Sequence, residues 1–350
     1  MQYIEKDNLK YKIVETVSGK YASVLYAIKD MKKITIPSEV NGIPVETISF
    51  GAFKSSENLT EVVFEEGVEL IETDAFRYCH SLSSVSLPKS LKTISHFAFD
   101  DCTNLENVFV QEGLEKIGSN AFSGCFMANF NFPESLKIIG ESAFFGSTLY
   151  FAEFKSNLES IGNSAFRECD FLKNINFSEG IKTIGTGVID GCIELTSVHI
   201  GKNATILDIE DDFAFECPNL QNINVSSKNE KHVVIDGVLY DLETKTLVKI
   251  PPCLIKDKIC VPKWVKNAAY ASFEDIQYIG TILFGQKRIE GLEEAGLDTN
   301  AKLKIRCYSD SNIAELAKEK DIKMYPLNSQ LNEFLSDIAE NENRNNVPEV

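Results

Sequence analysis

Residues 82–105 read LSSVSLPKSLKTISHFAFDDCTNL, and variants of this stretch fill most of the chain. Its most regular part is an isoleucine followed by three variable residues and an Ala-Phe pair. Successive Ala-Phe pairs are separated by 23, 23, 23, 22 and 22 residues. They are Ala52-Phe53, Ala75-Phe76, Ala98-Phe99, Ala121-Phe122, Ala143-Phe144 and Ala165-Phe166, and Val188-Ile189 and Ala214-Phe215 continue the series. A repeat of this length predicts a solenoid, in which each unit covers the apolar face of its neighbours.

Each unit contains one clear strand signal. Val85 and Leu87 alternate with serines, as in a strand with one buried face. Pro88 ends this strand because proline cannot donate to a ladder, and Leu91 and Ile94 begin the return segment. The buried strand positions are Leu59/Val62/Phe64, Leu82/Val85/Leu87, Leu105/Val108/Val110, Met127/Phe130/Phe132, Leu149/Ala152/Phe154, Leu172/Ile175/Phe177, Leu195/Val198/Ile200 and Leu220/Ile223/Val225. We therefore expect eight consecutive parallel strands.

The unit resembles the BspA-like (Treponema-type) leucine-rich repeat. The resemblance covers residues 9 to 326, and Ile117-Gly118, Ile139-Gly140 and Ile161-Gly162 match the second half of the family motif directly. It implies a strand-dominated α/β fold. The expected fold is a leucine-rich-repeat solenoid, a curved right-handed superhelix with a parallel β-sheet on its concave face. Members of this family are commonly bacterial or protist surface or secreted proteins that bind host or matrix proteins.

The ends of the chain depart from the repeat, which suggests caps over the first and last units. We expect an N-terminal β cap over residues 1–44, repeats of 22–26 residues over 45–225, and a β-hairpin insertion over 226–262. Asp236-Gly237 between apolar runs is the signal for the hairpin.

A degenerate repeat and a C-terminal cap are expected over 263–326, with a helix that begins after Asp310-Ser311. Residues 327–350 read as an amphipathic helix and a disordered tail. The apolar stripe of that helix either docks on the solenoid or binds a partner. It consists of Leu327, Leu331, Phe334, Leu335 and Ile338.

Charge excludes several classes of partner. The formal net charge is −17, so the chain lacks the basic footprint that nucleic acid requires, and anionic membrane surfaces are disfavoured. The sequence contains no run of 18 apolar residues, so it predicts no membrane-inserted span. The start, MQYIEKDNLKYKIVE, lacks the pattern of a signal peptide. We expect a monomer that is either cytoplasmic or, as the family resemblance implies, at the cell surface or secreted.

Six of the nine cysteines occupy one column of the repeat, and we interpret them as buried thiols that fill a core position. They are Cys79, Cys102, Cys125, Cys169, Cys192 and Cys217. The column contains no close ligand pair, so it does not predict a zinc site. Cys253 and Cys260 lie outside it, and a disulfide between them is an open alternative.

The sequence contains no motif of catalysis or of cofactor binding, so we expect no enzyme, no cofactor and no metal. The acidic segment made of Asp208 and residues 210–212 suggests a Ca²⁺ site, but the segment lacks the alternation and the glycine of a calcium-binding loop. A solvated acidic bend is the other interpretation. The edge acids Glu66, Glu112, Glu134 and Glu179 either steer a basic partner or keep that edge soluble.

The outward strand positions are mostly Ser and Asn, and a few apolar residues interrupt them. Exposed aromatic rings on a rigid sheet are typical of protein-binding anchors, unless loops or caps cover them. The candidate partner-binding residues are Val63, Asn107, Phe109, Asn129, Tyr150, Phe151 and Asn174. We expect a non-enzymatic, adhesion-type module whose rigid concave face binds a host or matrix protein. The alternatives are an intracellular scaffold or regulator and, because of the asparagines near aromatic rings, a carbohydrate-binding protein.

Overall fold

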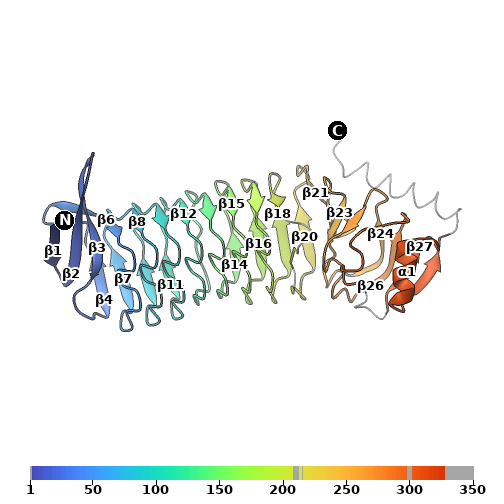
Figure 1. The fold of residues 1–350 in the computed structure, drawn as a ribbon, viewed down its shortest axis with the longest axis horizontal. Helices are drawn as coiled ribbons and strands as arrows, with labels where there is room; N and C mark the ends of the chain where they lie inside the picture. Colours follow the sequence, from blue (N-terminus) through green and yellow to red (C-terminus); the bar gives the residue numbers. More distant parts are fainter. Residues whose placement is uncertain (1, 208–212, 215, 298–301, 328–350) are drawn as a thin grey trace.

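The computed structural model describes residues 2–207, 213–214, 216–297 and 302–327. The described chain winds into an elongated array of turns, with β-hairpins at the N-terminal end and one α-helix near the C-terminal end (Figure 1). Each turn of the array stacks on the next, as the repeat predicts.

One side of the array, the long-strand face, carries the strands that the sequence predicts. Its first four-stranded parallel sheet contains β4 (Lys33–Ile36), β7 (Glu61–Phe64), β9 (Ser84–Ser86) and β11 (Asn107–Phe109). The second contains β14 (Phe151–Glu153), β16 (Asn174–Phe177), β18 (Ser197–Ile200) and β20 (Asn222–Val225). Our expectation of eight consecutive strands was wrong at residues 127–132, which form no strand and separate the two sheets.

Two sequence features coincide with this break. Other units place two residues between the column cysteine and the following leucine, and the leucine N–H donates to the cysteine carbonyl, as Leu105 does to Cys102 at 2.9 Å. Only Phe126 separates Cys125 from Met127, and Thr148 alone likewise separates Ser147 from Leu149 in the next unit, which still forms β14. The broken segment also buries the ring of Phe130, at a position where the strand-forming units have Val, Ile or Ala. We infer that the Phe130 ring, together with two successive short turns, carries the backbone out of register with β11.

The return segments form a second surface, the short-strand ladder, which continues past the break. Its repeating members are β6 (Ile43–Ile48), β8 (Leu70–Ile71), β10 (Thr93–Ile94), β12 (Lys116–Ile117), β13 (Ile138–Ile139), β15 (Ser160–Ile161), β17 (Thr183–Ile184) and β19 (Thr205–Ile206). All pair in parallel, and β12 pairs directly with β13 across the break. All of these strands except β6 have two residues, which are too few for an alternation signal, so the sequence does not reveal this ladder.

The phenylalanines of the Ala-Phe pairs form the centre of the core. Consecutive rings from Phe53 to Phe166 stack nearly parallel, with centroids 5.0, 5.0, 5.2, 5.5 and 5.2 Å apart. All six rings are almost completely buried. The ring stack also crosses the break, because Phe122 stacks on Phe144.

The cysteine column is buried, as the sequence predicts. Each thiol donates to a main-chain carbonyl of the preceding unit: Cys102 bonds Phe76 O at 3.1 Å and Cys125 bonds Phe99 O at 3.1 Å. Burial raises the pKa of the Cys169 thiol to about 12. All nine cysteines lie in the described chain as thiols, so the alternative of a disulfide between Cys253 and Cys260 was wrong.

The N-terminal end is made of antiparallel hairpins that lead into the short-strand ladder. The strands β1 (Gln2–Lys6), β2 (Leu9–Thr16) and β3 (Gly19–Ala27) pair in order, and β3 then pairs in parallel with β6. The short β5 (Glu39–Val40) turns back on β6 through Asn41 and Gly42, which both have positive φ.

The hairpin predicted at Asp236-Gly237 is confirmed, and both residues have the positive φ of a two-residue turn. It joins β21 (His232–Ile235) and β22 (Val238–Asp241), and β23 (Thr246–Lys249) pairs with β22 and with β25 (Asn267–Ala268). From the hairpin to the helix most buried apolar residues form a second core cluster, but Leu239 and Val248 belong to the cluster that contains the ring stack.

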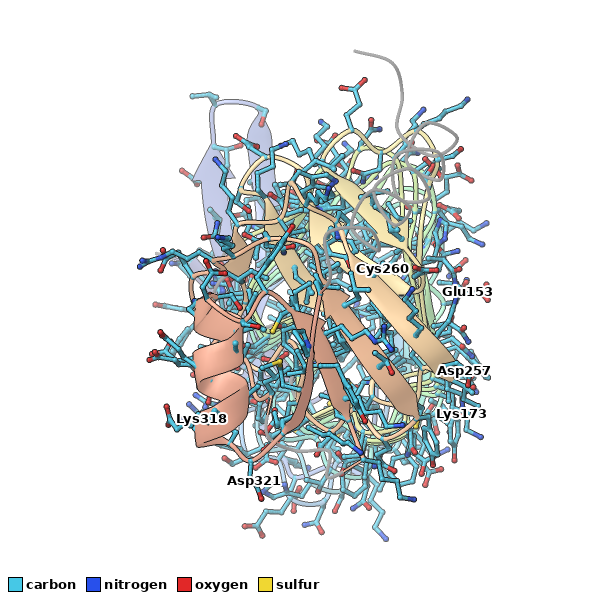
Figure 2. All side chains as sticks on the ribbon, turned by 90° about the vertical axis from the view of Figure 1, so that its right-hand side faces the viewer. Glu153, Lys173, Asp257, Cys260, Lys318 and Asp321 are labelled. Carbon is cyan, nitrogen blue, oxygen red and sulfur yellow. The ribbon has the colours of Figure 1, made fainter. Side chains whose placement is uncertain are left out.

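The last sheet contains β24 (Lys256–Val261), β26 (Ile279–Phe284), β27 (Lys304–Cys307) and β28 (Lys323–Pro326), with α1 (Asn312–Glu319) between the last two. The predicted helix start is confirmed, because the Ser311 hydroxyl accepts from Ala314 N–H at 3.1 Å. Seen from the C-terminal end, Asp257 of β24 lies on the same side as Glu153 of β14, and α1 lies on the other side (Figure 2). The helix and tail predicted over 327–350 lie outside the described residues, apart from Leu327.

Candidate functional site

All seven candidate partner-binding residues are exposed. The side chains of Phe109 and Phe151 are 59% and 47% accessible, and Val63 and Tyr150 are 37% and 39% accessible. The described loops and caps therefore do not cover these rings, contrary to the alternative interpretation that they do.

Strand register places these residues in rows across the two sheets. Val63 and Phe109 both lie opposite Ser86 of β9, one on each side. At about 4.8 Å between strands, their Cα atoms are about 10 Å apart. On the second sheet Phe151 lies opposite Asn174. The long-strand face thus has an apolar row on one sheet and an aromatic–amide pair on the other.

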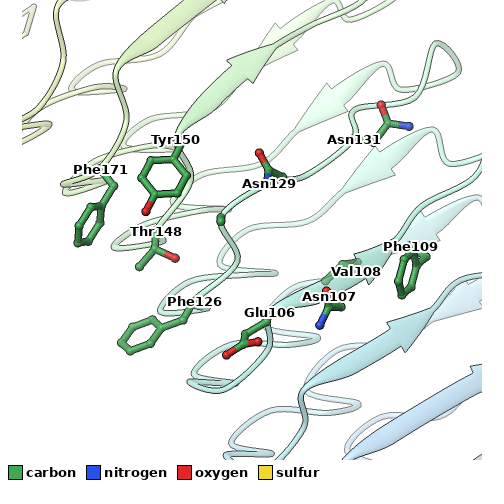
Figure 3. Close-up of a pocket in the computed structure, with 11 residues that line it drawn as sticks. Glu106, Asn107, Val108, Phe109, Phe126, Asn129, Asn131, Thr148, Tyr150 and Phe171 are labelled. Carbon is green, nitrogen blue, oxygen red and sulfur yellow. The ribbon is translucent and has the colours of Figure 1, made fainter.

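Four of the seven candidates meet at a hollow of about 710 Å³ in the sheet break (Figure 3). They are Asn107, Phe109, Asn129 and Tyr150. Val63, Phe151 and Asn174 do not line it. The remaining lining residues are Glu106, Val108, Phe126, Ala128, Asn131, Thr148 and Phe171.

Sequence analysis missed two aromatic residues of the hollow, Phe126 and Phe171, which are 53% and 47% accessible. Both occupy the turn between the column cysteine and the strand. A signal existed for Phe126, because its turn and the turn at Thr148, which also lines the hollow, are each one residue short. Turn residues do not contribute to the strand alternation from which the candidates were chosen.

The backbone around the hollow is open as well. In the described chain no backbone hydrogen bond joins residues 127–132 to β11, and the only one to the following unit's strand segment runs from Tyr150 N–H to Ala128 O at 3.0 Å. The hollow therefore exists because a sheet that should be continuous is interrupted there.

The edge acids have a structural role. The Glu112 carboxylate accepts from Glu134 N–H and Ser135 N–H of the next unit, both at 3.1 Å, and these bonds lower its pKa. Glu66 accepts from two main-chain N–H groups in the same way, and Glu179 from one. These carboxylates tie successive turns together, which explains the column without a basic partner.

One buried polar pair lies away from the hollow. His232 Nε2 accepts from Ile206 N–H at 3.1 Å, and its Nδ1 lies 3.2 Å from Asp241 Oδ2. Burial alone would raise the pKa of Asp241, but hydrogen bonds from His232 and Thr244 outweigh it and lower that pKa below its ordinary value. The pair joins the hairpin to the last turns of the repeat array and lines neither this hollow nor one beside α1.

Within the described residues, no group of three or more His, Cys, Asp or Glu side chains is arranged to hold a metal ion. The acidic stretch around residues 208–212 lies outside the described residues. None of the described helices has the length and apolar character needed to cross a membrane.

Comparisons with known proteins agree with the fold. The sequence matches the BspA type leucine rich repeat region, in six copies, over residues 20–150 and 137–235. No curated protein matches the chain.

Among solved structures, the pneumococcal vaccine antigen PcpA is 22% identical over 87% of this chain and 66% of its own, with a TM-score of 0.51. A leucine rich cell surface protein from Faecalibacterium prausnitzii A2-165 is 15% identical over 95% and 96%, with a TM-score of 0.48. The T. pallidum leucine rich repeat protein is 23% identical over 60% and 87%, with a TM-score of 0.44. The chain thus spans just under two thirds of the pneumococcal antigen.

Proposed function

This chain belongs to the BspA-type leucine-rich repeat proteins, and from that premise we propose that its long-strand face binds a protein partner in an adhesion-type, non-enzymatic role. The observation that carries the proposal is the exposure of Phe109 and Phe151 on two rigid sheets. Aromatic residues provide most of the binding energy in many protein interfaces. A preformed surface also loses little conformational entropy on binding.

The two sheets offer anchor points on both sides of the hollow. Val63 and Phe109 lie on the first sheet, and Phe151 and Asn174 on the second. We propose that a partner rests on both sheets, with asparagines supplying hydrogen bonds between the apolar contacts. A host or matrix protein is the partner that the family resemblance favours.

The test is the double variant Phe109→Ser/Phe151→Ser against a panel of matrix proteins by biolayer interferometry. Both rings are exposed, so the variant should keep the thermal transition of the parent chain and lose binding by at least about tenfold. The matched control is Phe50→Ser, because that ring is 65% accessible and does not belong to the long-strand face. An unchanged affinity in the double variant would remove these residues from the interface.

An intracellular scaffold is the second candidate function. The observation that favours it is that the described chain holds nine thiols and no disulfide, the usual state of cysteines in reducing compartments. Protease shaving of intact source cells separates the two candidates. Release of repeat peptides, with cytosolic markers retained, supports the adhesion-type role, and retention in the cells supports the scaffold.

A further inference from the structure

We propose that the hollow at the sheet break is a binding site for a neutral oligosaccharide. It has a volume of about 710 Å³, within the ~300–1,000 Å³ of typical small-ligand sites. The proposal shares Asn107, Phe109, Asn129 and Tyr150 with the protein-binding role, and it differs in its use of Phe126 and Phe171, which lie outside the protein-binding set.

The amides of the hollow are available to a ligand. Asn107, Asn129 and Asn131 make no side-chain hydrogen bond to any described part of the chain. Turn asparagines are bonded, as Asn219 is to Ile193 O at 2.8 Å, whereas the outward strand asparagines Asn174 and Asn222 make no side-chain bond to the described chain either but do not line the hollow. Each amide of the hollow therefore offers two donors and an acceptor oxygen. Three such groups in one hollow match a ligand that carries many hydroxyl groups.

Aromatic rings provide the apolar half of the site. Phe126, Tyr150 and Phe171 lie at one end of the hollow and Phe109 at the other, with Asn129 between them in the view of Figure 3. Tyr150 meets Phe171 edge to face at 6.0 Å, which holds the two rings at a fixed angle. A pyranose ring has apolar C–H faces and polar hydroxyl edges. Exposed rings beside unbonded amides can contact both at once.

Charge selects against acidic ligands. Among the described residues that line the hollow, none is Lys, Arg or His, and the one ionised side chain is Glu106. A sulfated or sialylated glycan would bring its negative charge to a carboxylate with no cation among the lining residues. Neutral sugars meet no such repulsion, so the site should discriminate between the two.

An added peptide strand fits the hollow less well. A strand joins a sheet by hydrogen-bonding along an open edge, but residues 128–131 of this chain lie across the hollow from β11. The Ala128 carbonyl is also bonded to Tyr150 N–H. β11 leaves a backbone edge of only three residues, Asn107–Phe109, open to the hollow, so most of the groups presented to a ligand are side chains.

The experiment measures oligosaccharide binding to the full chain by isothermal titration calorimetry. The probes are maltohexaose, cellohexaose and chitohexaose as neutral chains and a heparin-derived hexasaccharide as the anionic comparison. We expect at least one neutral chain to bind and the anionic one not to bind. The double variant Phe126→Ser/Phe171→Ser should weaken that binding by at least about tenfold.

Two matched controls test whether the loss of oligosaccharide binding comes from the hollow. Phe151→Ser removes an exposed ring of the long-strand face that does not line the hollow, and Phe50→Ser removes one elsewhere, so both should bind within about twofold of the parent chain. If the double variant loses its thermal transition, Asn129→Ala replaces it as the test. No binding of any neutral probe at millimolar concentration, or no change in the double variant, overturns the proposal.

A second arm identifies the source of the sugar. Ribonuclease B carries a neutral N-glycan, and ribonuclease A is the same polypeptide without it. Binding of ribonuclease B alone, competed by a hexasaccharide, indicates a glycan on a protein, whereas binding of hexasaccharides alone indicates a free polysaccharide. Equal binding of both ribonucleases through Phe126 and Phe171 would contradict sugar recognition. Loss of protein binding in Phe151→Ser with sugar binding intact separates this proposal from the protein-binding one.

Discussion

Replacing Phe99 by leucine should reveal how much the ring stack contributes to the stability of the array. Phe99 is completely buried and stacks on Phe76 at 5.0 Å and on Phe122 at 5.2 Å. Leucine keeps most of the apolar volume and removes both ring contacts. Each aromatic pair contributes ~0.5–1.5 kcal/mol beyond the area that it buries. The loss should therefore be about 1–3 kcal/mol.

Phe53→Leu is the matched control. Phe53 is as deeply buried, and its N–H donates to Ala75 O at 2.7 Å, as Phe99 N–H donates to Ala121 O at 2.8 Å. In the described chain Phe53 has one stacked neighbour and Phe99 has two. The control should lose about 0.5–1.5 kcal/mol, the value of one pair.

Urea denaturation followed by far-UV circular dichroism measures both variants. Stability in a solenoid is close to a sum of unit and nearest-neighbour terms, so the difference between the variants reports one neighbour contact. Equal losses in the two variants, or a larger loss for Phe53→Leu, would refute the view that stacking between units stabilises the array. The slope of the transition must stay constant for the comparison to hold.

Three further predictions concern the thiols and the buried polar pair. In the native chain only the half-buried Cys253 and Cys260 should react quickly with a disulfide reagent, and more than two fast thiols would contradict the burial of the column. The folded Cys169 keeps its proton up to about pH 12 and an unfolded thiol loses it near 9.0, so stability should fall above pH 9 by up to ~1.4 kcal/mol per pH unit for each such thiol. Thermal scans from pH 8 to 10 check this, and Cys169→Ala should give a shallower slope. His232→Ala removes one of the donors to the buried Asp241 carboxylate, which keeps Thr244, and leaves Ile206 N–H without its acceptor, so it should cost ~1–3 kcal/mol in urea denaturation; a loss below about 0.5 kcal/mol would contradict this.

The regular parts of the fold could be predicted from the sequence because the same physical signal is repeated in every unit. The strand alternation seen around Val85 and the Ala-Phe pair each recur many times along the chain, so neither pattern arises by chance. The N-cap at Ser311 and the turn at Asp236-Gly237 depend only on nearby residues, and both are confirmed. Local chemistry decides these features.

The sheet break is different, because it depends on how one unit fits the next. Met127, Phe130 and Phe132 follow the strand pattern, so alternation predicts a strand at this position. This place is distinguished by two successive one-residue turns, at Phe126 and Thr148, and by the large Phe130 ring, which change turn length and side-chain size without changing the alternation. Sequence analysis therefore named four residues of the hollow without predicting that there is a hollow.

The parts of the array that stay continuous at the break explain why the hollow is suited to binding. Only the long-strand face is interrupted at the break. Beneath it Phe122 still stacks on Phe144 at 5.5 Å, and β12 still pairs with β13 in the short-strand ladder. These two connections hold the units on either side of the hollow at a fixed separation. A ligand would then meet a site whose backbone is already ordered, so little of its interaction energy would be spent on closing the gap. A local change in turn length and core size thus opens one face, while the ring stack and the short-strand ladder stay continuous across the opening.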